Sequence, residues 1–305
     1  MAETIIRTQS IEKKYGGFAA VSNLSIQVEK GDIYALVGQN GAGKTTLLKL
    51  VCGLTPSTSG KLELFGGSSP RQFSAARARM GTMIETPSFF PYLSARDNLE
   101  YYCIQRGGKK ADIDAALHFV GLDKTGGKKF KNFSLGMKQR LGLALAVMNH
   151  PDILVLDEPI NGLDPMGIKE FRDIILKMNQ ERKTTVLISS HILGELSQIA
   201  TTYGFIHKGR LIEHISAANL KEKCRSCLRI DVDNPEKAAD VLHNQLSCTK
   251  FQVKGNTLQI DEHLDTPEIF VKALVESGVA VSQVFRSGIN LEQYFINLIG
   301  GSQNV

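Results

Sequence analysis

Three short runs of apolar residues mark the chain, and segments with helical periodicity lie between them. The apolar runs are Ile33–Val37, Ile153–Leu156 and Thr184–Ile188. Unbroken apolar runs of this length are typical of strands that are buried on both faces of a parallel sheet. The helical patterns lie around residues 44–52, 134–149 and 165–182. Buried strands that alternate with helices predict an α/β fold with a doubly wound parallel sheet.

Two further patterns add subdomains to this sheet. Residues 3–14 and 24–30 alternate between apolar and polar side chains, as half-buried strands do, and they predict an antiparallel β subdomain. Residues from about 87 to 150 are mostly helical in pattern and contain no buried-strand run. We therefore expect a helical subdomain inserted into the α/β core.

The pattern changes after about residue 216. Strand patterns lie at 228–233, 251–253, 258–260 and 279–285, and helical patterns at 235–246, 267–277 and 291–299. A Lys-Gly-Asn turn signal separates the second and third strands. The order β-α-β-β-α-β with a terminal helix is that of a ferredoxin-like unit. We expect two domains, 1–215 and 216–305, of which the second is a small accessory α+β domain.

Composition limits the possible partners. The chain has 305 residues, 42% of them hydrophobic, which is enough for two domains of ordinary size. A net charge of +5 is too small to indicate nucleic-acid binding by itself. The odd count of five cysteines is more typical of a reducing compartment than of a disulfide framework. No run of about 18 apolar residues is present, so we expect no membrane span, and any membrane role must come through a partner.

The most specific chemical signal is Gly38-Gln-Asn-Gly-Ala-Gly-Lys-Thr45, which fits the P-loop pattern G-x-x-x-x-G-K-[ST]. It follows a predicted buried strand and precedes a predicted helix, as a phosphate-binding loop should. Its glycines let backbone N–H groups turn inward around an anion. We expect Lys44 to bridge the β- and γ-phosphates and the Thr45 hydroxyl to bind Mg²⁺. The candidate nucleotide-binding residues of this segment are Gly38, Asn40, Gly41, Gly43, Lys44, Thr45 and Thr46.

Two carboxylates, Asp157 and Glu158, end the apolar run that begins at Ile153. Charge is costly to bury, so carboxylates at this place usually lie at the mouth of the strand, near a metal ion. We expect Asp157 to hold Mg²⁺, directly or through water. Glu158 should face another side of the chain, where it can orient or deprotonate the water that attacks the γ-phosphate. A pair of ordinary loop charges is the alternative, and the P-loop argues against it.

Three other candidates also have structural explanations. His191 follows the third apolar run, at the sheet edge where ligands bind in open α/β folds, and it is a candidate γ-phosphate sensor; a structural or solvated histidine is the alternative. Residues 161–165, Asn-Gly-Leu-Asp-Pro, follow the two carboxylates, and the sequence does not decide between a plain turn and a functional one. Tyr15, upstream of the P-loop, could stack on a nucleotide base or pack in the core.

The segment Asn132–Arg140, NFSLGMKQR, resembles the start of a helix. Ser134 is a good N-cap residue, and apolar residues follow at helical spacing at Leu141, Leu145 and Met148. The helix should end near His150, ahead of a proline. Lys138 and Arg140 lie in the first turns, where acidic residues are normally favoured. A solvated basic turn is one explanation, and an anion bound at the helix N-terminus is the other.

Together these motifs resemble those of an ABC ATPase in order and spacing, over residues 1 to about 215. NFSLGMKQR occupies the place of that family's signature motif, usually Leu-Ser-Gly-Gly-Gln. Ser134 and Gly136 match it, whereas Leu135 and Met137 do not. The resemblance implies a RecA-like P-loop NTPase core that binds ATP and Mg²⁺.

The resemblance also implies a dimer, expected to be a homodimer, in which two ATPase domains face each other head to tail. The signature helix of one domain would point its N-terminus, with Ser134 and Gly136, at the γ-phosphate held by the other. Tyr15 would then stack on adenine, Asp164 would couple the two sites, and His191 would sense the γ-phosphate. Lys138 and Arg140 would add positive potential behind the signature.

One residue departs from the ABC pattern. ABC ATPases usually have a Gln at the end of a strand between the P-loop and the signature, and this chain has Glu85 there. Glu85 could bind Mg²⁺ or orient water as a catalytic residue. At an effective dielectric constant of about 20, its attraction to Mg²⁺ at roughly 4 Å is about 8 kcal/mol, and its repulsion from a doubly charged γ-phosphate at roughly 6 Å is about 5–6 kcal/mol. The two energies are similar, so the net effect depends on geometry.

Glu85 and the sequence FSLGM make the chain similar to the ATPase subunits of bacterial self-protection transporters for bacitracin and lantibiotics, which also carry an extra C-terminal region. This implies an ATPase that energises transport or expulsion of a peptide antibiotic through separate integral membrane permease subunits. The protein would be cytoplasmic and peripheral on the inner face of the plasma membrane. Residues 87–93, Pro-Ser-Phe-Phe-Pro-Tyr-Leu, form either a local minicore or, as in ABC transporters, a contact with the permease.

Two rival functions share the P-loop. The first is a soluble ABC ATPase that acts on nucleic acid or another non-membrane partner; ribosome-type members have two ATPase halves and repair-type members long coiled coils, and this sequence has neither. The second is a GTPase or small-molecule kinase, which would not account for the signature or for Ser190-His191. We therefore expect no nucleic-acid partner.

Overall fold

The structure is a computed structural model that describes residues 3–85, 88–105, 107, 109–224 and 227–301. Its contacts divide the chain into two compact units, Met1–Ala217 and Ala218–Val305. Each unit has its own buried core.

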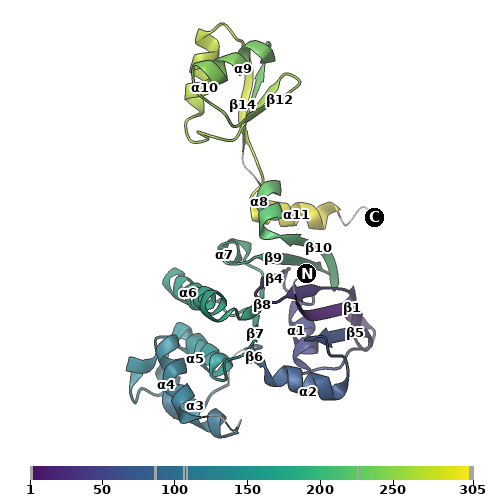
Figure 1. The fold of residues 1–305 in the computed structure, drawn as a ribbon, viewed down its shortest axis with the longest axis vertical. Coiled ribbons are helices and arrows are strands. Elements are labelled where there is room, and N and C mark those ends of the chain that lie inside the picture. The colour runs from purple at the N-terminus through teal and green to yellow at the C-terminus, as the bar shows by residue number, and fades with distance from the viewer. Residues whose placement is uncertain (1–2, 86–87, 106, 108, 225–226, 302–305) are drawn as a thin grey trace. The chain divides into compact units, whose positions relative to one another are not determined.

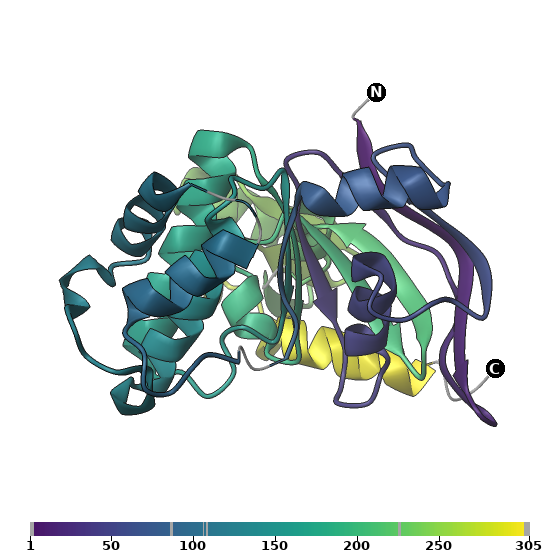
Figure 2. The same cartoon turned by 90° about the horizontal axis from the view of Figure 1, so that it is seen from below.

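The centre of the first unit is a six-stranded sheet in the order β10-β9-β4-β8-β7-β6. Its strands are β4 (Ile33–Val37), β6 (Met80–Met83), β7 (Ile153–Asp157), β8 (Thr185–Ser190), β9 (Thr202–His207) and β10 (Arg210–Ser216). All strands pair in parallel except β10, which is antiparallel to β9. Figures 1 and 2 show α1 (Lys44–Cys52) on one face and α6 (Pro165–Arg182) on the other. This confirms the predicted α/β core.

Helices pack on both faces of the sheet, and this explains the apolar runs. Every residue of β4, β7 and β8 is buried. Strands covered on both faces have no polar face to present, so their sequences are continuously apolar. The carboxyl ends of these parallel strands lie at one edge of the sheet, where polar groups can follow them.

An antiparallel subdomain is built on the long strand β1. Strand β1 (Thr4–Tyr15) pairs with β2 (Phe18–Leu24), β3 (Gln27–Glu29) and β5 (Ser59–Leu64). The predicted strand at 24–30 is wrong in its bounds, because β2 ends at Leu24 and a separate β3 follows. Strand β5 and the capped helix α2 (Pro70–Ala78) were not predicted.

The helical subdomain consists of α3 (Ala95–Gln105), α4 (Lys110–Phe119) and α5 (Leu135–Val147), with short 3₁₀ turns η1 (Asp123–Thr125) and η2 (Phe130–Asn132). The Ser134 side chain accepts a hydrogen bond from the Met137 N–H at 3.3 Å, which confirms it as the N-cap of α5. The helix ends at Val147, and His150 has a positive φ of 48°. A short helix, α7 (Leu193–Leu196), follows β8.

The second unit has the element order β-α-β-β-α-β between two flanking helices. Its elements are α8 (Ala217–Lys223), β11 (Cys227–Val232), α9 (Pro235–Asn244), β12 (Phe251–Lys254), β13 (Thr257–Ile260), α10 (Pro267–Glu276), β14 (Val281–Ser287) and α11 (Leu291–Gly301). The strands form an antiparallel sheet in the order β12-β13-β11-β14. Ile230, Leu258 and Leu274 are fully buried in the core of this unit.

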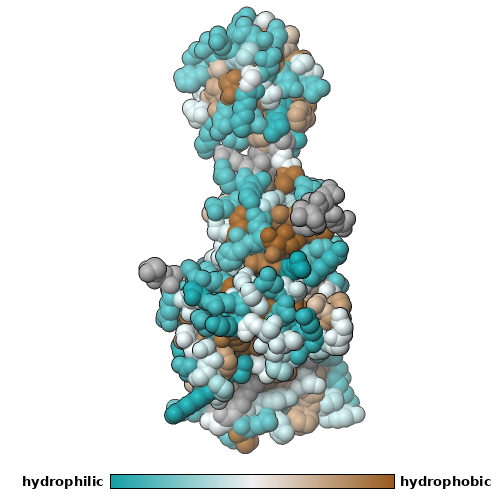
Figure 3. Space-filling view, turned by 90° about the vertical axis from the view of Figure 1, so that its right-hand side faces the viewer, coloured by the Kyte–Doolittle hydropathy of each residue, from teal (hydrophilic) through white to brown (hydrophobic). Residues whose placement is uncertain are grey.

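None of the described helices combines the length and the apolar character that a bilayer crossing requires. Figure 3 shows hydrophilic residues over much of the face that it presents, with hydrophobic residues gathered in smaller patches.

Candidate functional site

The loop after β4 is shaped for close contact between its backbone and a ligand. Gly43 is the N-cap of α1 with a φ of 106°, and a Cβ there would lie 2.4 Å from the Ala20 carbonyl oxygen. A Cβ on Gly38 would lie 2.5 Å from the Ile206 carbonyl oxygen. Neither position can accept a side chain without a backbone shift. Glycine is therefore required at both ends of this loop.

The N-terminus of α1 has the properties of an anion site. All residues of this helix are described, and among them no side chain caps the N-terminus and no acidic residue lies in the first turn. Its free N–H groups and the positive end of the helix dipole therefore point out of the helix toward any bound anion. Asn40 and Gly41 lie at the exposed tip of the loop, and Thr45 and Thr46 lie half-buried in the first turn of α1.

Lys44, Glu158 and His191 form a connected group of charges. The buried Lys44 Nζ donates hydrogen bonds to the carbonyl oxygens of Gly38 at 2.7 Å and Gln39 at 3.2 Å. It also lies 3.0 Å from Glu158 Oε1, an ion pair without hydrogen-bond geometry. Glu158 Oε2 lies 2.7 Å from His191 Nδ1. Residues that follow the first, second and third apolar runs therefore meet at one place.

We expected strand alternation to turn the Glu158 side chain away from Asp157, and the structure shows a different cause. The φ of Glu158 is 46°, so the chain leaves the strand at this residue and the alternation of side chains along a strand does not apply. The Glu158 N–H donates to Ser189 Oγ at 2.9 Å, and the Ser189 hydroxyl donates to Asp157 Oδ1 at 2.7 Å. A turn held by Ser189 thus directs the two carboxylates apart.

Ser189 was missed by the sequence reasoning. It lies opposite Asp157 in the parallel pairing of β8 with β7, and it is fully buried. A hydroxyl group at the end of an otherwise apolar run was the available signal, because a buried hydroxyl needs a hydrogen-bond partner.

The residues predicted to bind Mg²⁺ fit that ion. Asp157 is only 6% exposed, at the carboxyl end of β7, and Thr45 is in the first turn of α1. Among the described residues, no three His, Cys, Asp or Glu side chains gather as a metal site. Mg²⁺ usually takes one or two carboxylates and completes its shell with substrate phosphates and water. One carboxylate and one hydroxyl beside a phosphate-binding loop are such a donor set.

Glu85 lies two residues beyond β6 and is paired with a lysine of α1. Its Oε1 lies 2.5 Å from Lys49 Nζ. The hydrogen bond with Glu85 is the main cause that raises the pKa of Lys49 above its ordinary value. Pro87, the start of the predicted aromatic segment, lies outside the described residues.

Tyr15, the last residue of β1, presents its ring to solvent. The residue is 49% exposed, so the alternative of core packing is wrong. Lys13 Nζ lies 4.9 Å from the ring centroid, a cation–π contact. The opposite face of an exposed ring is suited to stacking on a planar base.

The remaining predicted residues line a separate groove of about 390 Å³ between α5 and α6, and none of the P-loop residues is among its lining. Ser134 and Gly136 lie at the start of α5, beside the N-cap of α6. That N-cap is Asp164, whose Oδ1 accepts a hydrogen bond from the Gly167 N–H at 3.1 Å. The segment 161–165 therefore has at least a structural role, as a helix cap.

The two basic residues behind the signature already have partners. Arg140 Nη1 lies 3.2 Å from Glu170 Oε2, and Lys138 Nζ lies 5.4 Å from the centroid of the Phe130 ring. The expected positive potential from Arg140 is therefore reduced by the neighbouring carboxylate.

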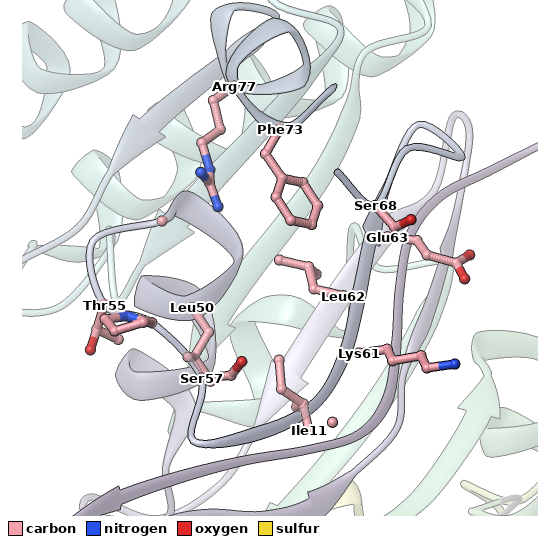
Figure 4. A pocket seen from close by; sticks show the side chains of 13 residues that line it. Ile11, Leu50, Thr55, Ser57, Lys61, Leu62, Glu63, Ser68, Phe73 and Arg77 are labelled. Atoms are coloured by element: carbon pink, nitrogen blue, oxygen red, sulfur yellow. The ribbon is translucent and has the colours of Figure 1, made fainter. Parts of the chain in front are cut away.

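A larger pocket of about 720 Å³ lies between β1, β5, α2 and the end of α1. Figure 4 shows its lining, with Phe73 of α2 and Leu62 of β5 pointing toward one another. None of the predicted site residues lines it, so volume alone does not identify the functional site.

The aromatic segment is partly buried and partly exposed. Phe89 is buried and packs on Tyr102 and Phe130. Phe90 and Tyr92 are exposed, and Lys131 Nζ lies 4.7 Å from the Tyr92 ring centroid. The segment therefore forms a minicore at Phe89 and leaves an exposed aromatic surface beside it, whereas the contact with a permease stays a prediction.

Comparison with known proteins gives relatives that match most of the chain. A family model described as ABC transporter matches residues 21–161. The chain is 39% identical to the bacitracin transport ATP-binding protein BcrA of Enterococcus faecalis, over 98% of this chain and 97% of the relative. It is 40% identical to BcrA of Bacillus licheniformis, over 98% of both. It is 41% identical to the lantibiotic transport ATP-binding protein SrtF of Streptococcus pyogenes, over 72% of this chain and 95% of the relative.

Solved structures share the fold. The chain resembles cbiO1 of Clostridium perfringens, described as part of an ABC transporter complex, with a TM-score of 0.66 and 23% identity over 72% of this chain and 92% of the other. It resembles the dimeric cassette MJ0796 with a TM-score of 0.63 and 20% identity, over 70% of this chain and 99% of the other.

Proposed function

The chain belongs to the ATP-binding proteins of ABC transporters, and we propose that it energises the transport or expulsion of a peptide antibiotic of the bacitracin or lantibiotic type. As a member of this family it binds and hydrolyses ATP. The observation that carries the proposal is that the similarity to two BcrA proteins extends over 98% of the chain. It therefore includes the second unit.

The geometry around α1 supports a proposed place for the nucleotide. The triphosphate of ATP binds in the loop 38–43 and at the N-terminus of α1, with the adenine on the exposed face of Tyr15. Lys44 moves from Glu158 to the phosphates, because a triphosphate carries more negative charge than one carboxylate. Thr45 and Asp157 would hold Mg²⁺, which would neutralise charge on the phosphates.

Hydrolysis is assigned to the carboxylate that this movement releases. Once Lys44 contacts the phosphates, Glu158 Oε1 is free to accept a proton from water, while Oε2, which lies 2.7 Å from His191 Nδ1, keeps its own partner. In this proposal, His191 fixes the orientation of the carboxylate and senses the γ-phosphate. Glu158 is the general base or water-orienting residue in this proposal.

The groove of Ser134, Gly136 and Asp164 supports a homodimer. Ser134 and Gly136 lie at the N-terminus of α5, which attracts anions, yet the P-loop of the same chain does not line the groove. A second chain in head-to-tail orientation would supply the missing nucleotide.

Permease subunits are the other partners we propose. No described helix can span a membrane, so the transported peptide needs a separate pathway. The exposed residues Phe90 and Tyr92 are candidates for the contact with a permease. The protein would then act on the cytoplasmic, inner face of the plasma membrane.

Co-purification tests this assignment. The tagged protein is purified from detergent-solubilised membranes of its own cells, and the proteins that accompany it are identified by mass spectrometry. We expect a polytopic membrane protein at near-stoichiometric yield, and its loss when Phe90 and Tyr92 are both replaced by serine. Recovery with nucleic acid or ribosomes and no membrane protein would instead support an ABC ATPase with a non-membrane partner.

A further inference from the structure

The ion pair between Lys49 and Glu85 lies beside the proposed metal site. Thr45 and Lys49 are four residues apart on α1, so they lie on the same face of the helix. Glu85 follows β6, which pairs in parallel with β7, the strand that ends at Asp157. The pair therefore joins the helix that begins at the P-loop to the strand edge that carries the carboxylates.

Charge gives this pair a role beyond an ordinary surface contact. Three carboxylates, Asp157, Glu158 and Glu85, lie at or just beyond the ends of β7 and β6, at the edge where a triphosphate binds in the proposed site. Each has a specific partner: Asp157 accepts from a hydroxyl, Glu158 pairs with Lys44, and Glu85 pairs with Lys49. Two lysines of one helix thus neutralise two of the three negative charges.

Lys49 also lies within the electrostatic field of the site. Besides the hydrogen bond and the charge of Glu85, the charge of Asp157 raises the pKa of Lys49. Its side chain is 32% exposed, whereas that of Glu85 is 63% exposed. The lysine is the better fixed of the two, so it determines where the carboxylate lies.

We propose that Lys49 is a positioning residue for Glu85. Lys49 holds the Glu85 carboxylate at the margin of the nucleotide site and neutralises its charge so that ATP can bind. Without Lys49, the negative charge of Glu85 would oppose the phosphates. Mg²⁺ would relieve part of this repulsion. The inference rests on the proposed ATP site and is independent of the transported compound.

The test is equilibrium binding of ATP to the purified full-length chain, measured by calorimetry in EDTA and again with Mg²⁺. We expect Lys49→Met to weaken binding in EDTA by up to about fivefold, the upper end of what an exposed ion pair contributes. The loss should be smaller with Mg²⁺. Lys49→Arg should retain the parent affinity, because it retains the charge.

The contribution of the ion pair is separated from other effects of Lys49 by repeating Lys49→Met in a chain whose residue 85 carries no charge. In a Glu85→Gln background, Lys49→Met should leave the affinity unchanged. Lys30→Met is the matched control, because it removes another exposed ion pair of the same unit, with Glu3 at 2.7 Å. It should change neither the affinity nor its dependence on Mg²⁺.

Three results would overturn the inference. An equal loss in the parent and Glu85→Gln backgrounds would mean that Lys49 contacts the nucleotide itself. No loss in either would mean that the pair is a surface contact only. A loss accompanied by a lower unfolding temperature, and not restored in the double variant, would assign Lys49 to folding. If the parent chain binds no ATP, or Lys44→Ala binds it as tightly as the parent, the proposed site itself is wrong.

Discussion

Glu158 is the residue on which the proposed chemistry depends most directly. We expect Glu158→Gln to bind ATP at least as tightly as the parent, because Lys44 loses its competing carboxylate partner 3.0 Å away. Hydrolysis should fall about 100-fold or more, since an amide cannot accept the proton of the attacking water. The ATP-bound dimer should therefore accumulate. Turnover of labelled ATP and elution volume on a sizing column with ATP measure both effects.

The control for this variant is Glu181→Gln, which neutralises an exposed carboxylate near the end of α6. It should hydrolyse ATP at the parent rate and show no trapped dimer. Parent-like turnover by Glu158→Gln would remove Glu158 from the catalytic role and leave it as the partner of Lys44 alone.

At the scale of elements, local sequence signals predicted the helices α1 and α6 best. The bounds of α1 and α6 agree with the predicted ranges, because a glycine precedes the first and an Asp-Pro pair begins the second. Strand β5 was missed, because only one of its six residues is buried and its pattern is mostly polar. Its place is fixed by pairing with β1, which is distant in sequence.

The candidate site shows the same division between local and long-range information. The P-loop and the Asp157–Glu158 pair are recognised from contiguous residues. Contacts between elements are not: no local pattern indicates that Lys49 pairs with Glu85 or that Ser189 holds the turn after β7. Such partners are set by tertiary packing.

The signature helix α5 provides a prediction at this scale. We expect Ser134→Arg to block ATP-driven dimerisation, because it places a large side chain in the groove where the second chain's phosphate would bind. Elution volume with ATP, with a hydrolysis-deficient chain as reference, measures the dimer. Nucleotide binding by the monomer should remain, since the P-loop does not line this groove.

Loss of an N-cap is itself destabilising, by about 1 kcal/mol, so the control must share that cost. Ser69→Arg removes the capping-box serine of α2, which is outside both predicted site regions. This variant should dimerise normally. If Ser134→Arg forms a dimer at the same ATP concentration as the parent chain, the head-to-tail arrangement is contradicted.

At the scale of the whole molecule, two separate cores predict two unfolding transitions. The first core includes β4 and α1, and the second includes β11 and α10. A ligand stabilises only the unit that binds it, by about 2.7 kcal/mol when ATP is present at about 100 times its Kd. We therefore expect calorimetry of the full chain to show two transitions, of which ATP raises one.

Leu274→Ala identifies the other transition. Leu274 is fully buried in the second core, so its truncation should destabilise that unit by about 2–5 kcal/mol. The transition that responds to ATP should not move. A single transition that both ATP and Leu274→Ala shift would show instead that the two units unfold together. The stability of the nucleotide-binding unit would then depend on residues 218–305, and their contribution to ATP binding would have to be measured with the full chain.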